Sequence, residues 1–122
     1  MAVLSEEQSM LRDMAQDWVN NESPVSAFRK LRDSGSRQGF DPAVYAEMAS
    51  MGWTGIVIPE AYGGTDFGWF SLGLVLEELG RTLTPSPLAS SSAAAAAIVL
   101  GGSDEQKDKW LPRIAAGEIV AT

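Results

Sequence analysis

The stretch from Ser50 to Arg81 decides the fold and reads SMGWTGIVIPEAYGGTDFGWFSLGLVLEELGR. A helix is predicted to end at Gly52, because a residue without a Cβ atom tolerates the left-handed conformation that closes helices. The apolar run from Trp53 to Ile58, here called the clip, is too short for a helix and rich in β-branched residues, which predicts buried extended chain. Pro59 ends the clip, and Tyr62-Gly63-Gly64 predicts a tight turn.

After the turn, apolar residues return at helical spacing, which predicts a helix from about Trp69 to Leu83. This helix carries adjacent carboxylates, Glu77 and Glu78, which invite an acid–base interpretation. Neighbours on a helix point about 100° apart, so a solvated face is predicted instead, with one carboxylate pairing with Arg81. The Gly63-Gly64 pair lacks the spacing of a phosphate-binding loop and is interpreted as a turn.

The other helices are predicted from their termini. Helix starts are indicated by two capping boxes and two capping residues followed by proline: Ser5 with Gln8, Ser103 with Gln106, Ser23-Pro24 and Asp41-Pro42. A further helix begins near Leu88 and stops at Gly101-Gly102. The last helix is predicted to continue to Trp110, to be interrupted by Pro112 and to end before Gly117.

The first helix carries an apolar stripe, formed by Met10, Leu11, Met14, Ala15, Trp18 and Val19. A ligand surface is one interpretation, but core packing is favoured, because each helix of a bundle buries one stripe. Together the elements predict an all-α antiparallel bundle of about five or six helices over residues 1–117. Residues 118–122 are predicted to begin a strand that has no partner in this chain.

Composition excludes several classes of function. The chain has 122 residues, enough for one domain, and a net charge of −7, which argues against nucleic-acid binding. It contains no cysteine and no histidine, which excludes disulfides, thiolate or imidazole metal sites and Ser-His or Cys-His nucleophiles. No membrane span is expected, and the N-terminus does not resemble a signal peptide, so a cytoplasmic location is expected.

Three motifs in order carry a family resemblance. Gly52-Trp53 precedes the clip, Pro59-Glu-x-Tyr-Gly-Gly follows it, and Glu77-Glu-Leu-Gly-Arg81 closes the next helix. Farther on come Gly102-Ser-Asp-Glu-Gln-Lys107, Trp110-Leu-Pro112 and Ala116-Gly-Glu118. This pattern resembles the N-terminal helical domain of acyl-CoA dehydrogenases over essentially the whole chain.

The resemblance implies a flavin enzyme that oxidises the α and β carbons of an acyl-CoA thioester with FAD. In that family a β-domain and a second helical domain follow and supply the catalytic glutamate and most of the flavin site; residues 118–122 would begin the β-domain. No catalytic, FAD-binding or metal residue is therefore assigned to this chain, which alone is expected to be inactive and to bind no stoichiometric FAD. The implied partners are the acyl-CoA substrate, the remaining domains and further copies in a homo-oligomer.

The alanine-rich helix after Leu88 has one face of small residues. On a helix, Leu88, Ala95 and Val99 share one side, and the opposite side is formed by Ser86, Ser90, Ala93 and Ala97, with Ala89 at its edge. From the residues alone, either a neighbouring helix packs closely there or the face lines a cavity. The family resemblance implies that this helix walls the acyl-chain pocket. Ser86, Ala89, Ser90, Ala93 and Ala97 are therefore the predicted substrate-binding residues, in a pocket roomy enough for a bulky or branched acyl group.

Two other classes stay open on sequence alone. The chain is alternatively a free-standing helical binding module that kept the pocket without the chemistry, or an interaction domain that docks on a separate partner. A reading frame that continues beyond Thr122 would favour the enzyme, and one that stops there would favour the binding module.

Overall fold

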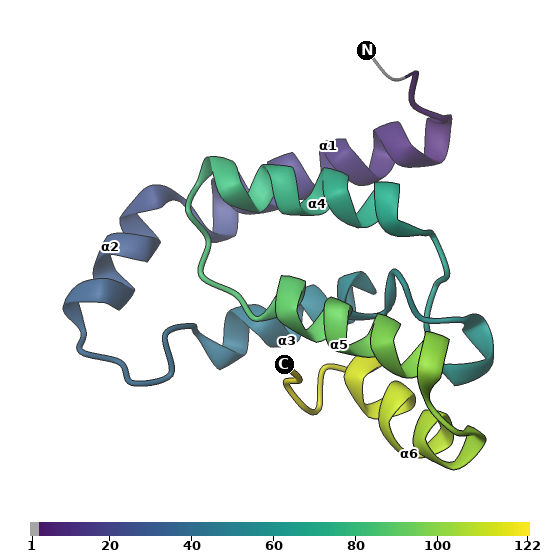
Figure 1. The fold of residues 1–122 in the computed structure, drawn as a ribbon. Coiled ribbons are helices and arrows are strands. Elements are labelled where there is room, and N and C mark those ends of the chain that lie inside the picture. Colours follow the sequence, from purple (N-terminus) through teal and green to yellow (C-terminus); the bar gives the residue numbers. More distant parts are fainter. Residues whose placement is uncertain (1–2) are drawn as a thin grey trace.

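The computed structural model describes residues 3–122, none of which forms a strand (Figure 1). The six helices are α1 (Glu6–Glu22), α2 (Val25–Asp33), α3 (Pro42–Ser50), α4 (Trp69–Arg81), α5 (Leu88–Gly101) and α6 (Asp104–Ala115). This confirms the all-α bundle. In Figure 1, α1 and α4 form one layer, α3, α5 and α6 form a second, and α2 stands at one edge.

The helices of the first layer run in the same direction. The start of α1, near Gln8, lies beside Phe67 and Ser71 at the start of α4. At the other end, the hydroxyl groups of Ser23 and Thr84 are hydrogen-bonded at 2.8 Å, just beyond the two helices. The antiparallel packing predicted for the bundle is found for α5 and α6 instead (Figure 1).

Local capping chemistry starts three of the helices as predicted. Both capping boxes are complete: Ser5 and Gln8 exchange two hydrogen bonds at the start of α1, and Ser103 and Gln106 do so at α6. Asp41 accepts a backbone N–H group at the start of α3, where proline takes the first helical position. These caps satisfy backbone donors that a helix leaves without partners.

Two predictions about proline were wrong. Ser23 does not cap α2: its hydroxyl bonds Thr84, and Pro24 takes the capping position without a side-chain bond. Pro112 does not interrupt α6, which continues through it to Ala115. Proline removes its own N–H donor, but its carbonyl still accepts the N–H of Ala116 at 3.0 Å, so the helix continues beyond it.

The clip is buried as predicted but is not extended. Residues 53–55 form a 3₁₀ turn, η1 (Trp53–Gly55), and a second such turn, η2 (Glu60–Tyr62), follows Pro59. The prediction of extended chain was wrong because buried N–H and C=O groups need partners. No described strand offers them, so bonds of the 3₁₀ type, such as Ile58 N–H to the Gly55 carbonyl at 3.1 Å, supply them locally.

The glycine turn closes tightly on the clip. Gly63 has a φ of +88°, and a Cβ atom at Gly64 would lie 1.9 Å from the Ile58 carbonyl oxygen. The amide of Thr65 donates to the Gly55 carbonyl at 2.9 Å. No side chain fits at residue 64 without moving the backbone, so the tight turn is confirmed.

The core has two parts, and α5 contributes to both. The first cluster lies between α1, α3, α4 and η1 and includes Trp53 and Leu88. The second lies between the clip, α5 and α6 and includes Ile58, Ala95 and Leu111. Thr54 links the clip to α6, because its buried hydroxyl donates to the Ala115 carbonyl at 2.6 Å.

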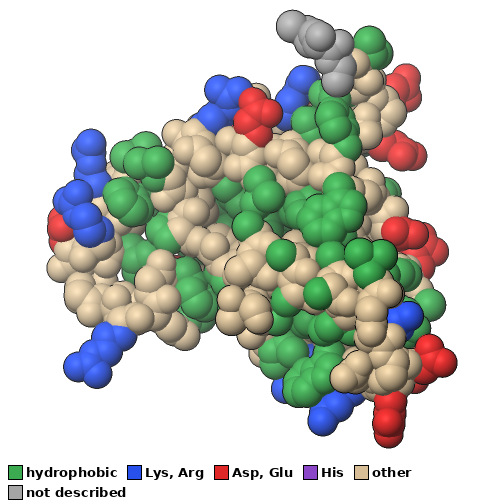
Figure 2. Space-filling model, in the orientation of Figure 1, with side chains coloured by type: hydrophobic (Ala, Val, Ile, Leu, Met, Phe, Trp, Pro, Cys, Tyr) green, Lys and Arg blue, Asp and Glu red, His purple; other side chains and the backbone are tan. Residues whose placement is uncertain are grey.

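The α1 stripe is only partly buried. Ala15 and Val19 are buried, and Trp18 packs edge-on against Trp53, with ring centroids 5.3 Å apart. Met10 is 70% exposed and Met14 50%, so the core interpretation was wrong for these two. Figure 2 shows hydrophobic side chains gathered on the surface over the α4 layer. The exposed large ones on α1 and around the start of α4 are Met10, Met14, Phe67, Trp69 and Phe70.

Residues 118–122 form no strand here and fold back onto α5. Ser91, which is buried, accepts the Ala121 N–H at 3.0 Å and donates to the Ala121 carbonyl at 3.3 Å. Ile119 and Ala121 pack against the second cluster. Hydrogen bonds to the side chain of Ser91 therefore hold the last residues against α5.

Candidate functional site

The small face of α5 is open in this structure. Ala89, Ser90, Ala93 and Ala97 are exposed, whereas Leu88, Ser91, Ser92 and Ala95 of the same helix are buried. The predicted division of α5 into two faces is thus confirmed for Leu88 and Ala95. No described helix packs closely on the small face, so the face is accessible to a ligand or to protein outside residues 3–122.

Ser86 lies at the start of α5, partly buried, and its hydroxyl is already engaged. It accepts the Leu88 N–H at 3.0 Å and lies 3.5 Å from the Met48 sulfur atom. Ser90 donates to the Pro87 carbonyl at 3.0 Å. Both hydroxyl groups stabilise the first turn of the helix, so the face presents mainly methyl and methylene groups outward.

A hollow of about 240 Å³ adjoins this face, between the end of α4 and the start of α5. It brings Ser86 and Ala89 together, while Ser90 and Ala93 do not line it. Its full lining is Leu76, Leu79, Gly80, Leu83, Thr84, Ser86, Leu88 and Ala89. Ala97 borders a different hollow, toward Trp110 of α6. The predicted set therefore forms one continuous face with a hollow at each end.

Sequence reasoning missed the α4 side of the first hollow. Gly80 stands inside a helix, which was a usable signal, since glycine is disfavoured there. Leu83 follows α4 with a φ of +56°, in the left-handed region, and its side chain is 55% exposed. The amides of Leu83 and Thr84 donate to the carbonyls of Gly80 and Leu79 and so end the helix. Glycine usually occupies the left-handed position that Leu83 takes here.

The Glu77-Glu78 pair is held by one arginine. Arg81 Nη2 donates to Glu77 at 3.0 Å, and its Nε donates to Glu78 at 3.3 Å. Glu77 is solvated, as predicted, but Glu78 is only 3% exposed, so the prediction of a solvated face was wrong for it. Because both carboxylates are paired with the same cation, they do not form an acid–base pair.

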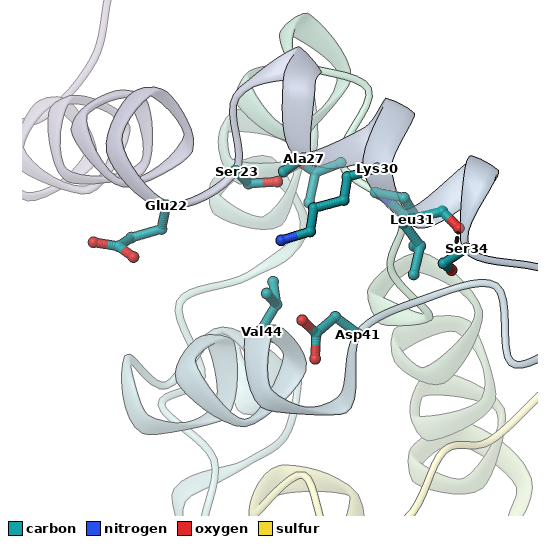
Figure 3. Close-up of a pocket in the computed structure, with 10 residues that line it drawn as sticks. Glu22, Ser23, Ala27, Lys30, Leu31, Ser34, Asp41 and Val44 are labelled. Carbon is teal, nitrogen blue, oxygen red and sulfur yellow. Dashed lines mark hydrogen bonds between the residues drawn. The ribbon is translucent and has the colours of Figure 1, made fainter. Parts of the chain in front are cut away.

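Another hollow, of about 320 Å³, lies where α1, α2 and α3 meet (Figure 3). Lys30 points into it between Glu22 and Asp41, and Leu31 and Val44 form part of its apolar wall (Figure 3). Sequence reasoning did not find it, because its residues come from segments far apart in the chain. It shares no lining residue with the small face of α5.

The glycine turn does not fit the phosphate groups of a flavin cofactor. The amides of Gly63 and Gly64 donate to the carbonyls of Glu60 and Pro59, and the Thr65 amide is bonded to Gly55. A phosphate-binding loop needs such amides free to point at the ligand.

No group of three or more metal-ligating side chains occurs among residues 3–122. No helix in this part of the chain is long and apolar enough to cross a bilayer.

Comparison with known proteins identifies the domain. Residues 5–118 match the family described as acyl-CoA dehydrogenase, N-terminal domain. The chain belongs to this family. Acyl-CoA dehydrogenase FadE12 of Mycobacterium tuberculosis is 32% identical over 121 residues, covering 94% of this chain and 29% of that protein. (2S)-Methylsuccinyl-CoA dehydrogenase of Cereibacter sphaeroides is 34% identical, covering 98% of this chain and 22% of the relative.

Solved structures agree on the fold. A variant of the Tcur3481-Tcur3483 steroid ACAD superimposes with a TM-score of 0.82 at 33% identity, covering 92% of this chain and 30% of that one. An acyl-CoA dehydrogenase from Bacillus anthracis, complexed with FAD, superimposes with a TM-score of 0.78 at 28% identity, covering 97% of this chain and 20% of that one. This acyl-CoA dehydrogenase domain thus spans about a third or less of the relatives it matches.

Proposed function

We propose that this domain serves an FAD-dependent acyl-CoA dehydrogenase, in which it forms part of the wall of the acyl-chain pocket. The observation that carries the proposal is the uncovered small face of α5, in a chain that belongs to the acyl-CoA dehydrogenase family. A face of alanine and serine methylene groups offers apolar contact without filling space, which suits a bulky or branched acyl group.

The domain's own contribution is binding rather than chemistry. Ser86, Ala89, Ser90, Ala93 and Ala97 would contact the acyl chain and exclude water from it. When bound in the complete enzyme, FAD would supply the oxidising chemistry by accepting a hydride from the β carbon. The glycine turn is not assigned to the flavin phosphates, because its amides donate to carbonyls within the chain.

The test uses the complete gene product that contains these residues. We expect it to oxidise acyl-CoA thioesters in the presence of an artificial electron acceptor. Ala93→Phe should shift its preference toward smaller acyl groups, because the added ring occupies the space proposed for the acyl chain. Oxidation with unchanged preference would refute the role of the small face.

The second candidate is a binding module without catalysis, which would use the same uncovered small face of α5 as its binding surface. A gene product that binds acyl-CoA, carries no flavin and oxidises nothing would establish this candidate. Domain packing and assembly with further copies are part of the first proposal. The structural relative described as the ChsE4-ChsE5 complex of Mycobacterium tuberculosis is an assembly of two named proteins.

A further inference from the structure

The hollow of about 320 Å³ lies along α2, a helix that buries none of its own residues (Figure 3). A helix packed on a bundle normally buries one apolar stripe. Here the apolar residues of α2 stay partly exposed: Val25, Ala27, Phe28 and Leu31. Ala27 and Leu31 line the hollow together with Val44 of α3. The fold thus leaves apolar side chains around an unfilled space that is large enough for a small molecule.

Three charged side chains from separate elements surround this space. Lys30 of α2 points into it between Glu22, the last residue of α1, and Asp41, which caps α3 (Figure 3). Within residues 3–122, no ion pair or side-chain hydrogen bond involves Lys30 or Glu22. The Asp41 carboxylate accepts one hydrogen bond, from the Ala43 amide to Oδ1 at 2.9 Å, and its other oxygen has none in this part of the chain. All three groups therefore keep the capacity to bind a ligand.

The charges and the apolar wall together define the ligand. A lone cation would be attracted by Glu22 and Asp41 but repelled by Lys30, and a lone anion would meet the reverse. A zwitterion suits both, with its ammonium group toward the two carboxylates and its carboxylate toward Lys30. We propose that this hollow binds a free α-amino acid with an aliphatic side chain, whose hydrocarbon part contacts Leu31 and Val44. The site is separate from the proposed acyl pocket, because it shares no lining residue with the small face of α5.

Three probes that share one hydrocarbon skeleton test the class of ligand. L-Leucine carries both charges, isoamylamine lacks the carboxylate and isocaproate lacks the ammonium group. Equilibrium dialysis of the complete gene product against radiolabelled L-leucine measures the dissociation constant, and the two analogues are then added as competitors. Each analogue loses one charge-assisted contact, so we expect each to bind at least about tenfold more weakly than leucine.

Lys30→Gln tests the contact with the ligand carboxylate, and Arg29→Gln is its matched control. Both substitutions remove one positive charge from neighbouring exposed positions of α2, but Arg29 does not line the hollow. We expect Lys30→Gln to weaken leucine binding at least about tenfold without weakening isoamylamine, which has no carboxylate. Arg29→Gln should leave the binding of both compounds unchanged.

Asp41→Asn tests the contact with the ligand ammonium group. Asparagine caps helices as well as aspartate does, so the start of α3 is preserved. We expect this variant to bind leucine and isoamylamine more weakly than the parent does, and isocaproate no more weakly. Melting temperatures equal to that of the parent show that a loss of binding in any variant is not a loss of fold.

Several results would overturn the inference. They are no saturable leucine binding by the parent, an analogue that competes as well as leucine, equal losses in Lys30→Gln and Arg29→Gln, and leucine binding unchanged in Asp41→Asn. Dialysis involves neither acyl-CoA nor oxidation, so each of these results refutes only the amino-acid site. A gene product that oxidises no acyl-CoA but binds leucine as described refutes only the proposed function.

Discussion

Replacing Ala95 by phenylalanine, with Ala93→Phe as its partner, tests whether α5 has one packed and one open face. Ala95 is 0% exposed and lies in the second core cluster with Ile58, Leu111 and Ile114, all of them fully or almost fully buried. Ala93 is exposed two residues away on the same helix. Both substitutions lose the same helix propensity, about 0.5 kcal/mol, so that loss cancels in the comparison.

The difference between the two variants measures packing. Inserting a ring into a filled core costs about 1–3 kcal/mol or more, because neighbouring side chains must leave their rotamers. An exposed position has no such cost. We expect Ala95→Phe to lower the free energy of unfolding by at least about 1 kcal/mol more than Ala93→Phe, measured by urea denaturation of the 122-residue chain with equal m-values. Equal destabilisation would mean that both faces are close-packed, and the pocket assignment would have to be withdrawn.

Three further substitutions test particular contacts. Leu83→Gly should raise the free energy of unfolding by about 0.5–1 kcal/mol, because it relieves a left-handed leucine with a half-exposed side chain; a loss in urea denaturation would show that the leucine packs more than its exposure indicates. Arg81→Ala should lower the free energy of unfolding clearly more than Glu77→Ala, because it leaves the buried Glu78 without its cation. The exposed pair of Arg81 with Glu77 contributes only about 0.3–0.5 kcal/mol. Similar midpoints of urea denaturation for the two variants would contradict this. Ser91→Ala should speed hydrogen exchange at the Ala121 amide at least about tenfold while core amides stay protected; an unchanged Ala121 rate would mean that the serine does not hold residues 118–122.

Sequence alone predicted the features that depend on neighbours along the chain. The capping boxes at Ser5 and Ser103 and the cap at Asp41 involve groups no more than three residues apart, so their chemistry is complete within the motif. The turn at Gly63-Gly64 was predictable for the same reason. The family resemblance rested on motifs between Gly52 and Glu118, which include this turn and the Ser103 box, and the predicted helices themselves indicated the all-α bundle.

What the sequence did not predict depends on contacts between distant segments. Burial of Glu78 depends on how α4 packs, and the Ser91–Ala121 bonds join residues 30 positions apart. The hydroxyl of Ser23 is hydrogen-bonded to Thr84, 61 residues away, and does not cap α2. The sequence predicted the α5 face of the candidate site but not the α4 residues beside it. Periodicity within one helix does not show which hollow that helix lines.

The packing of α5 explains how a site of small residues can be held precisely. Leu88 is fixed in the first core cluster and Ala95 in the second, and Ser91 between them binds the backbone of Ala121. The helix is thus anchored at three successive levels on one side, whereas Ala89, Ala93 and Ala97 on its other side are exposed. Substitutions on the open side change the shape of the surface without loosening the anchored side. Under the proposed function, replacing Ala89 or Ala93 would therefore change the shape of the acyl pocket while the position of α5 stays fixed.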